Sequence, residues 1–297
     1  MKVVISGASG FVGAALVEHL EKQNHDVTRL VRRPPTHEAT EHRWDPAVSD
    51  LDPQVVSGAD VIINLNGRSI SLGRWSAAVK QELRSSRLDA TRTIVQAITR
   101  AEIPPPLLIN ASATGYYGDR ENEELTEESA PGAGFLADLS REWEATALEA
   151  QSSETRVVIL RLGMILGDGA ALTKMLPPFK LGFGGPMGNG RQWWPWIALD
   201  DVLGAIDHVI AHREIKGPVN LVAPEATTSK SFARELGEYL GRPAIVPAPA
   251  FAVKLALGEM AEALLLSSTK AQPKVLEDTG YEFDASTLAV AFRQILG

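Results

Sequence analysis

The chain has 297 residues, of which 44% are hydrophobic, carries a formal net charge of −8 and contains no cysteine. This length holds one α/β domain and a smaller lobe. The negative charge argues against nucleic acid and anionic membranes as partners, and the lack of cysteine excludes disulfides, thiolate nucleophiles and cysteine-based metal sites. No apolar run reaches membrane-spanning length, so we expect a cytoplasmic protein.

The N-terminal segment combines a buried strand with a glycine-rich turn. Residues 3–5 are apolar, and glycines follow at positions 7, 10 and 13 before an amphipathic helical pattern. Gly7 permits a tight turn, Gly10 lets the backbone approach a pyrophosphate, and Gly13 removes a side chain where the helix packs on the strand. The free N–H groups of the helix then bind the phosphates. We therefore expect a dinucleotide site formed by Gly7, Ser9, Gly10, Phe11, Val12 and Gly13.

A second strand is predicted over residues 26–31, and two arginines, Arg32 and Arg33, follow it. They stand about twenty residues past the last glycine, where a protein specific for NAD usually carries an acid for the ribose 2′-hydroxyl. A guanidinium group matches the geometry of a phosphate and stays charged. The two arginines therefore favour NADP(H) as the cofactor.

Strand and helix patterns then alternate along the chain. Residues 60–64, 107–110 and 157–162 are apolar runs typical of strands, and residues 76–101 and 136–151 have helical periodicity. This alternation predicts an α/β fold with a doubly wound parallel sheet. Ligands of such sheets lie at the carboxyl ends of the strands, so we expect the residues directly after each strand to form the site.

The second half of the chain has a different character. Residues 167–196 are rich in glycine and proline and form too long a connection for a compact domain, so we expect part of a substrate wall there. A strand at 219–222 and a helix at 229–240 follow, and the sequence is mainly helical from about residue 244. We therefore predict a cofactor-binding Rossmann domain over residues 1–165, with the strand near 219–222 returning to its sheet, and a smaller substrate lobe over residues 166–297.

Two polar features are interpreted as structural. The six carboxylates of residues 119–128 predict a solvated loop, because they cannot all be buried. His208 and His212 have a spacing that can chelate zinc, but the sequence supplies no evident third ligand. We therefore expect no metal site.

Specific motifs along nearly the whole chain resemble those of a known family. They are Gly-Ala-Ser-Gly-Phe-Val-Gly at 7–13, Trp-Asp-Pro at 44–46, Asn-Leu-Asn-Gly at 64–67, Arg-Trp at 74–75, Ser-Arg at 86–87, Ser-Ala-Thr-Gly-Tyr-Tyr-Gly at 112–118, Phe-Leu-Ala at 135–137, Trp-Glu at 143–144, Arg-Leu-Gly at 161–163 and Gln-Trp-Trp-Pro-Trp-Ile at 192–197. The chain resembles atypical short-chain dehydrogenase/reductase proteins of the NAD-dependent epimerase/dehydratase type, which are called sugar-nucleotide epimerase-like and end in a helical domain of unknown function. The resemblance implies an extended-type Rossmann fold that binds NADP(H). It also implies cofactor contacts from Asn64, Leu65, Asn66, Gly67, Arg87 and Leu162.

The chain departs from the Tyr-x-x-x-Lys pattern of the wider superfamily. With Glu144 as the anchor, the matching helix positions hold Leu136 and Ser140, neither of which can move a proton as the tyrosine and lysine do. Ala198 stands where relatives often have histidine. The remaining catalytic candidates follow the strand at 107–110: Ser112, which could orient a carbonyl or hydroxyl, and either Tyr116 or Tyr117, which could donate a proton.

Several residues are candidates for the substrate. Arg74, Arg87 and Arg191 could bind an anionic group. Trp193, with Trp194 and Trp196, could stack on a ring, and burial in a lobe interface explains the three tryptophans equally well. Two functions follow from these patterns. One is an NADP(H)-dependent oxidoreductase or epimerase acting on a small polar or nucleotide-linked molecule, favoured by Ser112 and Tyr117. The other is an NADP(H)-binding sensor without turnover, favoured by the missing tyrosine and lysine.

Overall fold

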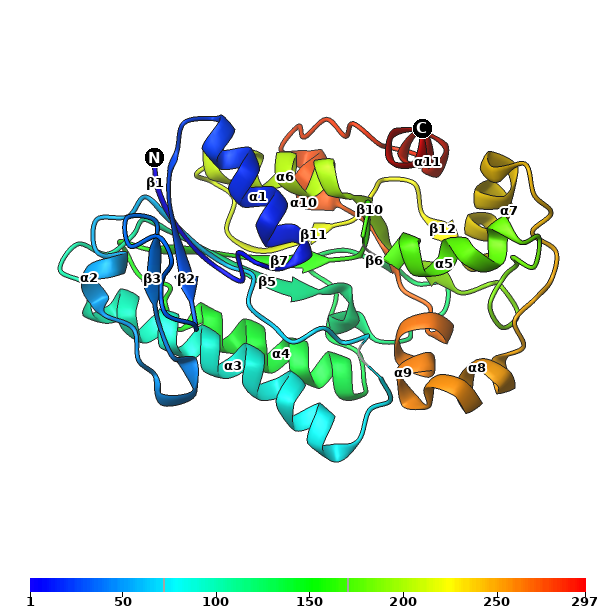
Figure 1. Ribbon diagram of the computed structural model, residues 1–297, viewed down its shortest axis with the longest axis horizontal. Helices are drawn as coiled ribbons and strands as arrows, with labels where there is room; N and C mark the ends of the chain where they lie inside the picture. The colour runs from blue at the N-terminus through cyan, green and yellow to red at the C-terminus, as the bar shows by residue number, and fades with distance from the viewer. Residues whose placement is uncertain (72, 170) are drawn as a thin grey trace.

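A seven-stranded parallel sheet forms the centre of the computed structural model, which describes residues 1–71, 73–169 and 171–297 (Figure 1). The strand order is β11-β7-β5-β4-β1-β2-β3, and the direction of progression reverses between β1 and β4, where such sheets bind their ligands. The predicted doubly wound α/β fold is confirmed. The strands are β1 (Lys2–Ser6), β2 (Asp26–Val31), β3 (Glu41–Arg43), β4 (Val61–Asn64), β5 (Leu107–Ala113), β7 (Arg156–Leu162) and β11 (Gly217–Leu221).

Helices cover both faces of this sheet (Figure 1). On one face α1 (Phe11–Lys22) and α6 (Leu199–Ala211) share a core with Val3 and Ile5, and on the other α3 (Ala77–Arg100) and α4 (Phe135–Leu148) share a core with Val4. Successive residues of a strand face opposite sides, so a strand covered on both faces needs an unbroken apolar run. The apolar run of β1 meets this need, because all three side chains are fully buried.

The glycine-rich turn between β1 and α1 depends on two close approaches. Gly7 has φ +76°, and a Cβ there would lie 2.7 Å from the carbonyl of Leu65. A Cβ on Gly13 would lie 2.2 Å from the carbonyl oxygen of Gly7. Larger residues would therefore push α1 away from the ends of β1 and β4.

The C-terminal part is mainly helical, as predicted, and has its own apolar core. Phe232 and Phe292 pack there with Trp194 and Trp196. Three short two-stranded pairs join segments that are distant in the sequence. They are β6 (Glu124–Leu125) with β13 (Lys270–Ala271), β8 (Met164–Leu166) with β10 (Trp196–Ala198), and β9 (Trp193–Trp194) with β12 (Thr227–Thr228). Its helices are α5 (Ala171–Lys180), α7 (Ser229–Leu240), α8 (Ala250–Leu257), α9 (Glu259–Ala261), η3 (Glu262–Leu266), α10 (Lys274–Asp278) and α11 (Leu288–Leu296).

The apolar core of the sheet includes residues from before and after position 165, the predicted domain boundary. Val202 of α6 and Leu276 of α10 belong to the same buried cluster as Val3 and Ile5. The returning strand is β11, which pairs in parallel with β7. The short helical segments η1 (Pro46–Val48), α2 (Pro53–Val56) and η2 (Thr114–Tyr117) belong to the N-terminal half.

The acidic run at residues 119–128 is not entirely solvated. Glu127 is buried, and its Oε1 accepts the backbone N–H groups of Asn220 (3.0 Å) and Val275 (3.2 Å). Burial raises the pKa of this carboxyl. The prediction of a solvated loop was therefore wrong for Glu127, because long-range contacts draw this end of the run inside. Across the described parts of the chain, no helix has the length and hydropathy needed to cross a bilayer.

Candidate functional site

The N-terminus of α1 is open to a ligand. Gly10, which precedes the helix, has extended backbone angles (φ −76°, ψ 172°), and no side chain caps the first turn. Ser9 and Gly10 are exposed, whereas Phe11 packs toward Gly167 and Val12 joins the core of the sheet. The first N–H groups of a helix lack intrahelical partners, so they can bind an anion at this position.

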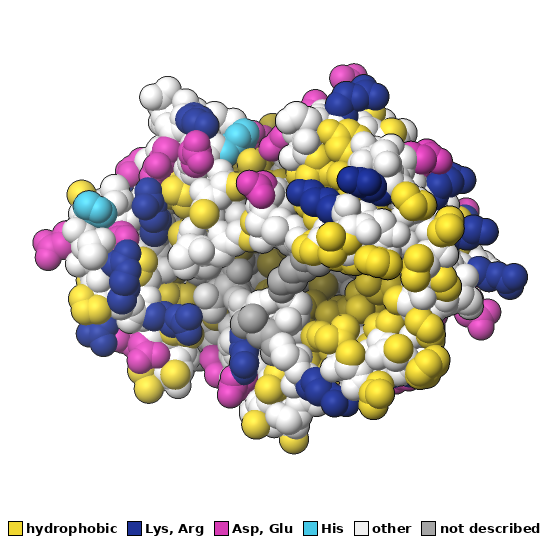
Figure 2. Space-filling view, turned by 45° about the vertical axis from the view of Figure 1, so that its right-hand side comes forward, with side chains coloured by type: hydrophobic (Ala, Val, Ile, Leu, Met, Phe, Trp, Pro, Cys, Tyr) yellow, Lys and Arg dark blue, Asp and Glu magenta, His cyan; other side chains and the backbone are white. Residues whose placement is uncertain are grey.

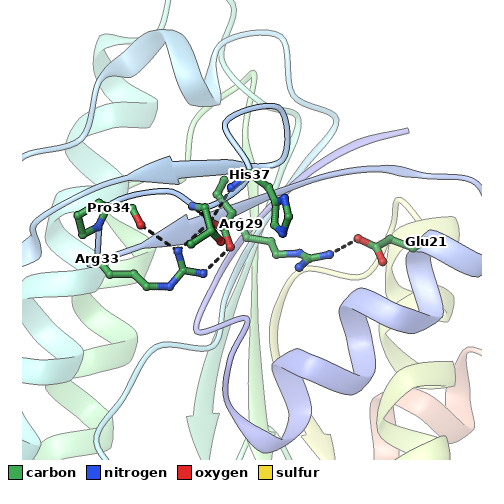
Figure 3. Close-up of polar contacts among 7 residues, drawn as sticks. Glu21, Arg29, Arg33, Pro34 and His37 are labelled. Atoms are coloured by element: carbon green, nitrogen blue, oxygen red, sulfur yellow. Dashed lines mark hydrogen bonds and ion pairs between the residues drawn. The ribbon is translucent and has the colours of Figure 1, made fainter.

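The two arginines after β2 differ in their partners. Arg33 donates hydrogen bonds to both carboxylate oxygens of Glu41 (2.9 and 2.6 Å) and to the carbonyl of Pro34 (2.9 Å; Figure 3). The Arg33 guanidinium, assisted by the backbone N–H of Thr36, holds the pKa of Glu41 well below its usual range. Arg32 is exposed and forms no hydrogen bond or ion pair with a described residue. Of the two arginines, Arg32 is therefore the one whose donors no described residue uses.

The buried side chain of Asn64 joins neighbouring strands. Its Oδ1 accepts the Ser6 hydroxyl (2.6 Å), and its amide donates to Thr91 Oγ1 (2.9 Å) and Asn110 Oδ1 (2.6 Å). The indole N–H of Trp143 donates to the same threonine oxygen (2.8 Å). This buried network ties β1, β4 and β5 to α3 and α4, at the base of the loop that leaves β4.

The loop after β4 is shaped by its own polar contacts. Leu65 packs on the core of the sheet, and the Asn66 side chain donates to the carbonyl of Ser86 (3.1 Å). Gly67 is exposed and lies against the guanidinium of Arg87, which is 5.2 Å from the ring of Trp143. Asn66, Gly67 and Arg87 are thus brought together at the carboxyl end of β4.

Ser112 belongs to a buried charged network. Its hydroxyl donates to Oε1 of Glu144 (2.6 Å), and Arg161 donates to both oxygens of that carboxylate (3.0 and 2.9 Å). Arg161 also donates to the Tyr117 hydroxyl (3.0 Å) and to the carbonyl of Glu127 (3.1 Å). The hydroxyl hydrogen of Ser112 is therefore directed at Glu144 and away from a substrate.

The two candidate tyrosines have different surroundings. Tyr117 is fully buried, with its hydroxyl 2.7 Å from Oδ1 of Asn220 and 2.9 Å from the carbonyl of Thr126. Burial raises the pKa of Tyr117 to about 12. Tyr116 is half-buried, its ring lies 3.6 Å from the Arg161 guanidinium, and its hydroxyl bonds to no described residue. Tyr116 thus has the available phenol.

Leu136, which the sequence motifs place at the position expected to match the superfamily's tyrosine, is an apolar residue of α4. Leu136 packs beside Gly115, where an added Cβ would lie 3.2 Å from the Leu136 Cβ. Ser140, one turn further along α4, is buried. Leu136 and Ser140 supply no ionisable group, so any proton transfer at this edge of the sheet would need side chains from other elements.

The remaining predicted site residues are distributed more widely. Arg74 approaches Gly258, between α8 and α9, and Arg191 is exposed. Trp193 is half-buried and donates its indole N–H to Asn122 (2.9 Å). Leu162 is half-buried at the end of β7. Among the described residues, no polar or ring contact links Arg191 or Trp193 to Tyr116 or Arg87.

Hydrophobic side chains surround a hollow on the face shown in Figure 2. Strongly exposed apolar residues occur on α8, where Phe251 and Leu255 are 74% and 75% exposed, and after α5, at Leu181 and Phe183. No residue of α8 is buried. Apolar surface of this kind is typical of binding regions. By contrast, the cavity beside Trp193, Trp194 and Trp196 has a volume of only about 10 Å³, too small for a substrate.

The described residues include no group of three or more side chains placed to hold a metal ion. His208 contacts Thr279 Oγ1 (2.9 Å) and His212 contacts Glu214 (2.8 Å), although their rings lie 4.0 Å apart.

Glu144 and Arg161 organise the buried network, yet the sequence motifs assigned no role to either. Both are almost fully buried, and their ion pair joins α4 to β7. A charged residue inside the otherwise apolar run at 157–162 is the signal that could have identified Arg161, because arginine is rarely buried unless it is paired.

Comparisons with known proteins identify the family. A model of the NAD dependent epimerase/dehydratase family matches residues 3–222, and a model of a domain of unknown function matches residues 248–295. An epimerase family protein of Mycobacterium leprae is 39% identical over 290 residues, covering 97% of this chain and 94% of that protein. The crystal structure of the human epimerase family protein SDR39U1 with NADPH has a TM-score of 0.92 and 33% identity, with 99% of both chains covered.

A nucleoside-diphosphate sugar epimerase from Corynebacterium glutamicum has a TM-score of 0.79 and 31% identity, and this chain spans 58% of its length. The matches to the family model and to the mycobacterial and human proteins extend over most of the chain and confirm the resemblance seen in the motifs. This chain belongs to the NAD-dependent epimerase/dehydratase family.

Proposed function

We propose that this protein binds NADP(H) and uses it as an oxidoreductase or epimerase on a small polar or nucleotide-linked substrate. The observation that carries the proposal is the contrast between Arg32 and Arg33. Arg33 neutralises Glu41, the carboxylate that would repel a 2′-phosphate, and Arg32 is left with its charge unpaired. The NADPH in the human relative supports the same cofactor.

The cofactor would lie along the carboxyl edge of the sheet, in a domain of residues 1–165 completed by β11. The turn at residues 7–13 and the N-terminus of α1 would receive the pyrophosphate. Gly67 and Leu162 would line the nicotinamide end, and Asn64, Leu65 and Asn66 would shape the loop beside it. Residues 166–297 would supply the substrate lobe, with the apolar surface of α8 as part of its wall.

Tyr116 is the residue proposed to move a proton. The cofactor, when bound, supplies or accepts a hydride at a substrate carbon. In the reductive direction Tyr116 would donate its phenolic proton to the carbonyl oxygen, giving an alcohol, and it would take the proton back in reverse. The Arg161 guanidinium packs against the ring of Tyr116, 3.6 Å from its centroid, and helps to position it. Ser112, Glu144 and Tyr117 lie in the network that holds Arg161 in place.

Calorimetry with NADPH, NADP⁺, NADH and NAD⁺ tests the cofactor assignment. Arg32→Ala should weaken NADPH binding by roughly 10-fold or more, the effect of losing a charged hydrogen bond, and should leave NADH within about twofold. Arg100→Ala is the matched control, because Arg100 is exposed in the last turn of α3, away from the carboxyl edge. Equal losses for NADPH and NADH in Arg32→Ala would refute recognition of the 2′-phosphate.

A second candidate is a sensor that binds NADP(H) without turnover, and it is favoured by Leu136 and Ser140 at the superfamily's catalytic positions. NADPH oxidation with a panel of aldehydes, ketones and nucleoside-diphosphate sugars separates the two. For any substrate found, Tyr116→Phe should bind NADPH normally and lose at least about 100-fold in turnover, whereas Tyr239→Phe on α7 should not. Intact NADPH binding with no turnover on any compound would favour the sensor.

A further inference from the structure

Arg87 is a partly desolvated cation without a carboxylate partner. Its Nη1 donates to the carbonyl of Leu83 on its own helix (3.0 Å), and it forms no ion pair with a described residue. Its guanidinium lies against Gly67 and 5.2 Å from the ring of Trp143. Most of its five N–H donors are thus unused, and its charge is not balanced by a carboxylate.

Other arginines near the core use their donors within the protein. Arg161 pairs with the Glu144 carboxylate, and Arg156 donates to backbone carbonyls, among them that of Ile215 (2.6 Å). Burial alone lowers the pKa of Arg87 to about 10, the direction expected of a charge removed from water with no opposing carboxylate. An uncompensated cation destabilises the folded protein, so its presence points to a ligand.

The position of Arg87 indicates which ligand this is. Gly67 follows β4 at the carboxyl edge, and Trp143 lies less than one turn after Ser140 on α4. Arg87 therefore brings a positive charge from α3 close to the place where the superfamily's lysine is missing. In the proposed function, the cofactor's phosphates have the N-terminus of α1 and Arg32. The anion that would pair with Arg87 then comes from the substrate.

We propose that Arg87 binds an oxyanion of the substrate, a carboxylate or a phosphate, at the nicotinamide end of the cleft. This inference rests on the proposed function. Gly67 makes room for the guanidinium, because a Cβ there would lie 3.2 Å from Cζ and 3.4 Å from Nη2 of Arg87. Gly67 has no positive φ, so Gly67→Ala would crowd the guanidinium without straining the backbone.

The first test compares Arg87→Met with Arg84→Met in the full-length protein. Methionine keeps most of the apolar stem and removes the charge. If Arg87 is held for a ligand, Arg87→Met should raise the Tm of the ligand-free protein by about 2 °C or more. Arg84→Met, one turn earlier and paired with Glu142, should not raise it. A fall in Tm for Arg87→Met would show a structural role and overturn the proposal.

The second test uses malonate and inorganic phosphate as probes at constant ionic strength. At least one of them should raise the Tm of the wild-type protein saturably, with and without NADPH, and Arg87→Met and Gly67→Ala should lose most of this shift. Arg84→Met should keep it. No saturable shift in the wild type, or an equal shift in Arg87→Met, would refute the site.

NADPH affinity separates the two sources of an oxyanion. Arg87→Met should bind NADPH within about twofold of the wild type, whereas a loss of about 10-fold or more would mean that Arg87 contacts a cofactor phosphate and would overturn the assignment to substrate. If the wild type binds no NADPH, the proposed function fails, whereas the anion shift measured without cofactor still reports on Arg87 itself.

Discussion

Removing the carboxylate of Glu144 should strongly destabilise the fold. In Glu144→Leu the Arg161 guanidinium, 3% exposed, loses two charged hydrogen bonds, and the Ser112 hydroxyl loses its acceptor. Breaking a buried ion pair by removing one partner costs about 3–5 kcal/mol, because the other charge stays buried and unpaired. Urea unfolding followed by circular dichroism should show this loss in the free energy of unfolding, with an unchanged m-value.

Two further variants make the result decisive. Glu142→Leu removes a partly exposed carboxylate from the same helix, which pairs with Arg84, and should cost less than about 1 kcal/mol. The double variant Glu144→Leu/Arg161→Met removes both buried charges and should recover about 2 kcal/mol or more of the single loss. Similar losses for Glu144→Leu and Glu142→Leu, or no recovery in the double variant, would contradict the reasoning.

Three more outcomes follow from the structure. Gly13→Ala places a Cβ 2.2 Å from the carbonyl oxygen of Gly7, so calorimetry should find NADPH binding lost, and urea unfolding should show a destabilisation of about 1–3 kcal/mol. Tyr117→Phe should destabilise by about 1–2 kcal/mol, since Asn220 and Arg161 lose a partner, and an unchanged urea midpoint would count against this. The lowered pKa of Glu41 means that its carboxylate stabilises the fold above the unfolded pKa near 4.5 and loses this effect as the pH falls. The Tm deficit of Glu41→Gln should therefore be full at neutral pH and shrink in acid, and a deficit independent of pH would argue against the ion pair with Arg33.

Local patterns predicted an element well where its signals lay inside the element or directly beside its ends. The helix expected at 229–240 is α7, because Thr228 caps its start through the Ser231 N–H and Gly241 ends it at φ +61°. The end of β5 could not be predicted in this way. The strand runs on to Ala113 instead of stopping at Asn110, because its last residues are small and owe their strand conformation to pairing with β7.

The sequence indicated which segments could form the candidate site, but it could not predict the contacts of each side chain. The glycine turn and the arginines after β2 have spacings that a sequence displays. The pairing of Arg33 with Glu41 and the hydrogen bonds of Tyr117 depend on which strands lie side by side. Tyr117 and Asn220 are far apart in the sequence, so no local pattern could predict that the Tyr117 hydroxyl bonds to Asn220.

The Asn64 network bears on how a dinucleotide would bind. Because the side chains of Ser6, Asn64 and Asn110 join three strands through bonds to one another, the base of the proposed cradle is held by the protein itself. A preorganised site loses little conformational entropy on binding. Association with this edge of the sheet should therefore be a single fast step, and its heat-capacity change should reflect contact area alone, without the large additional term that accompanies coupled folding.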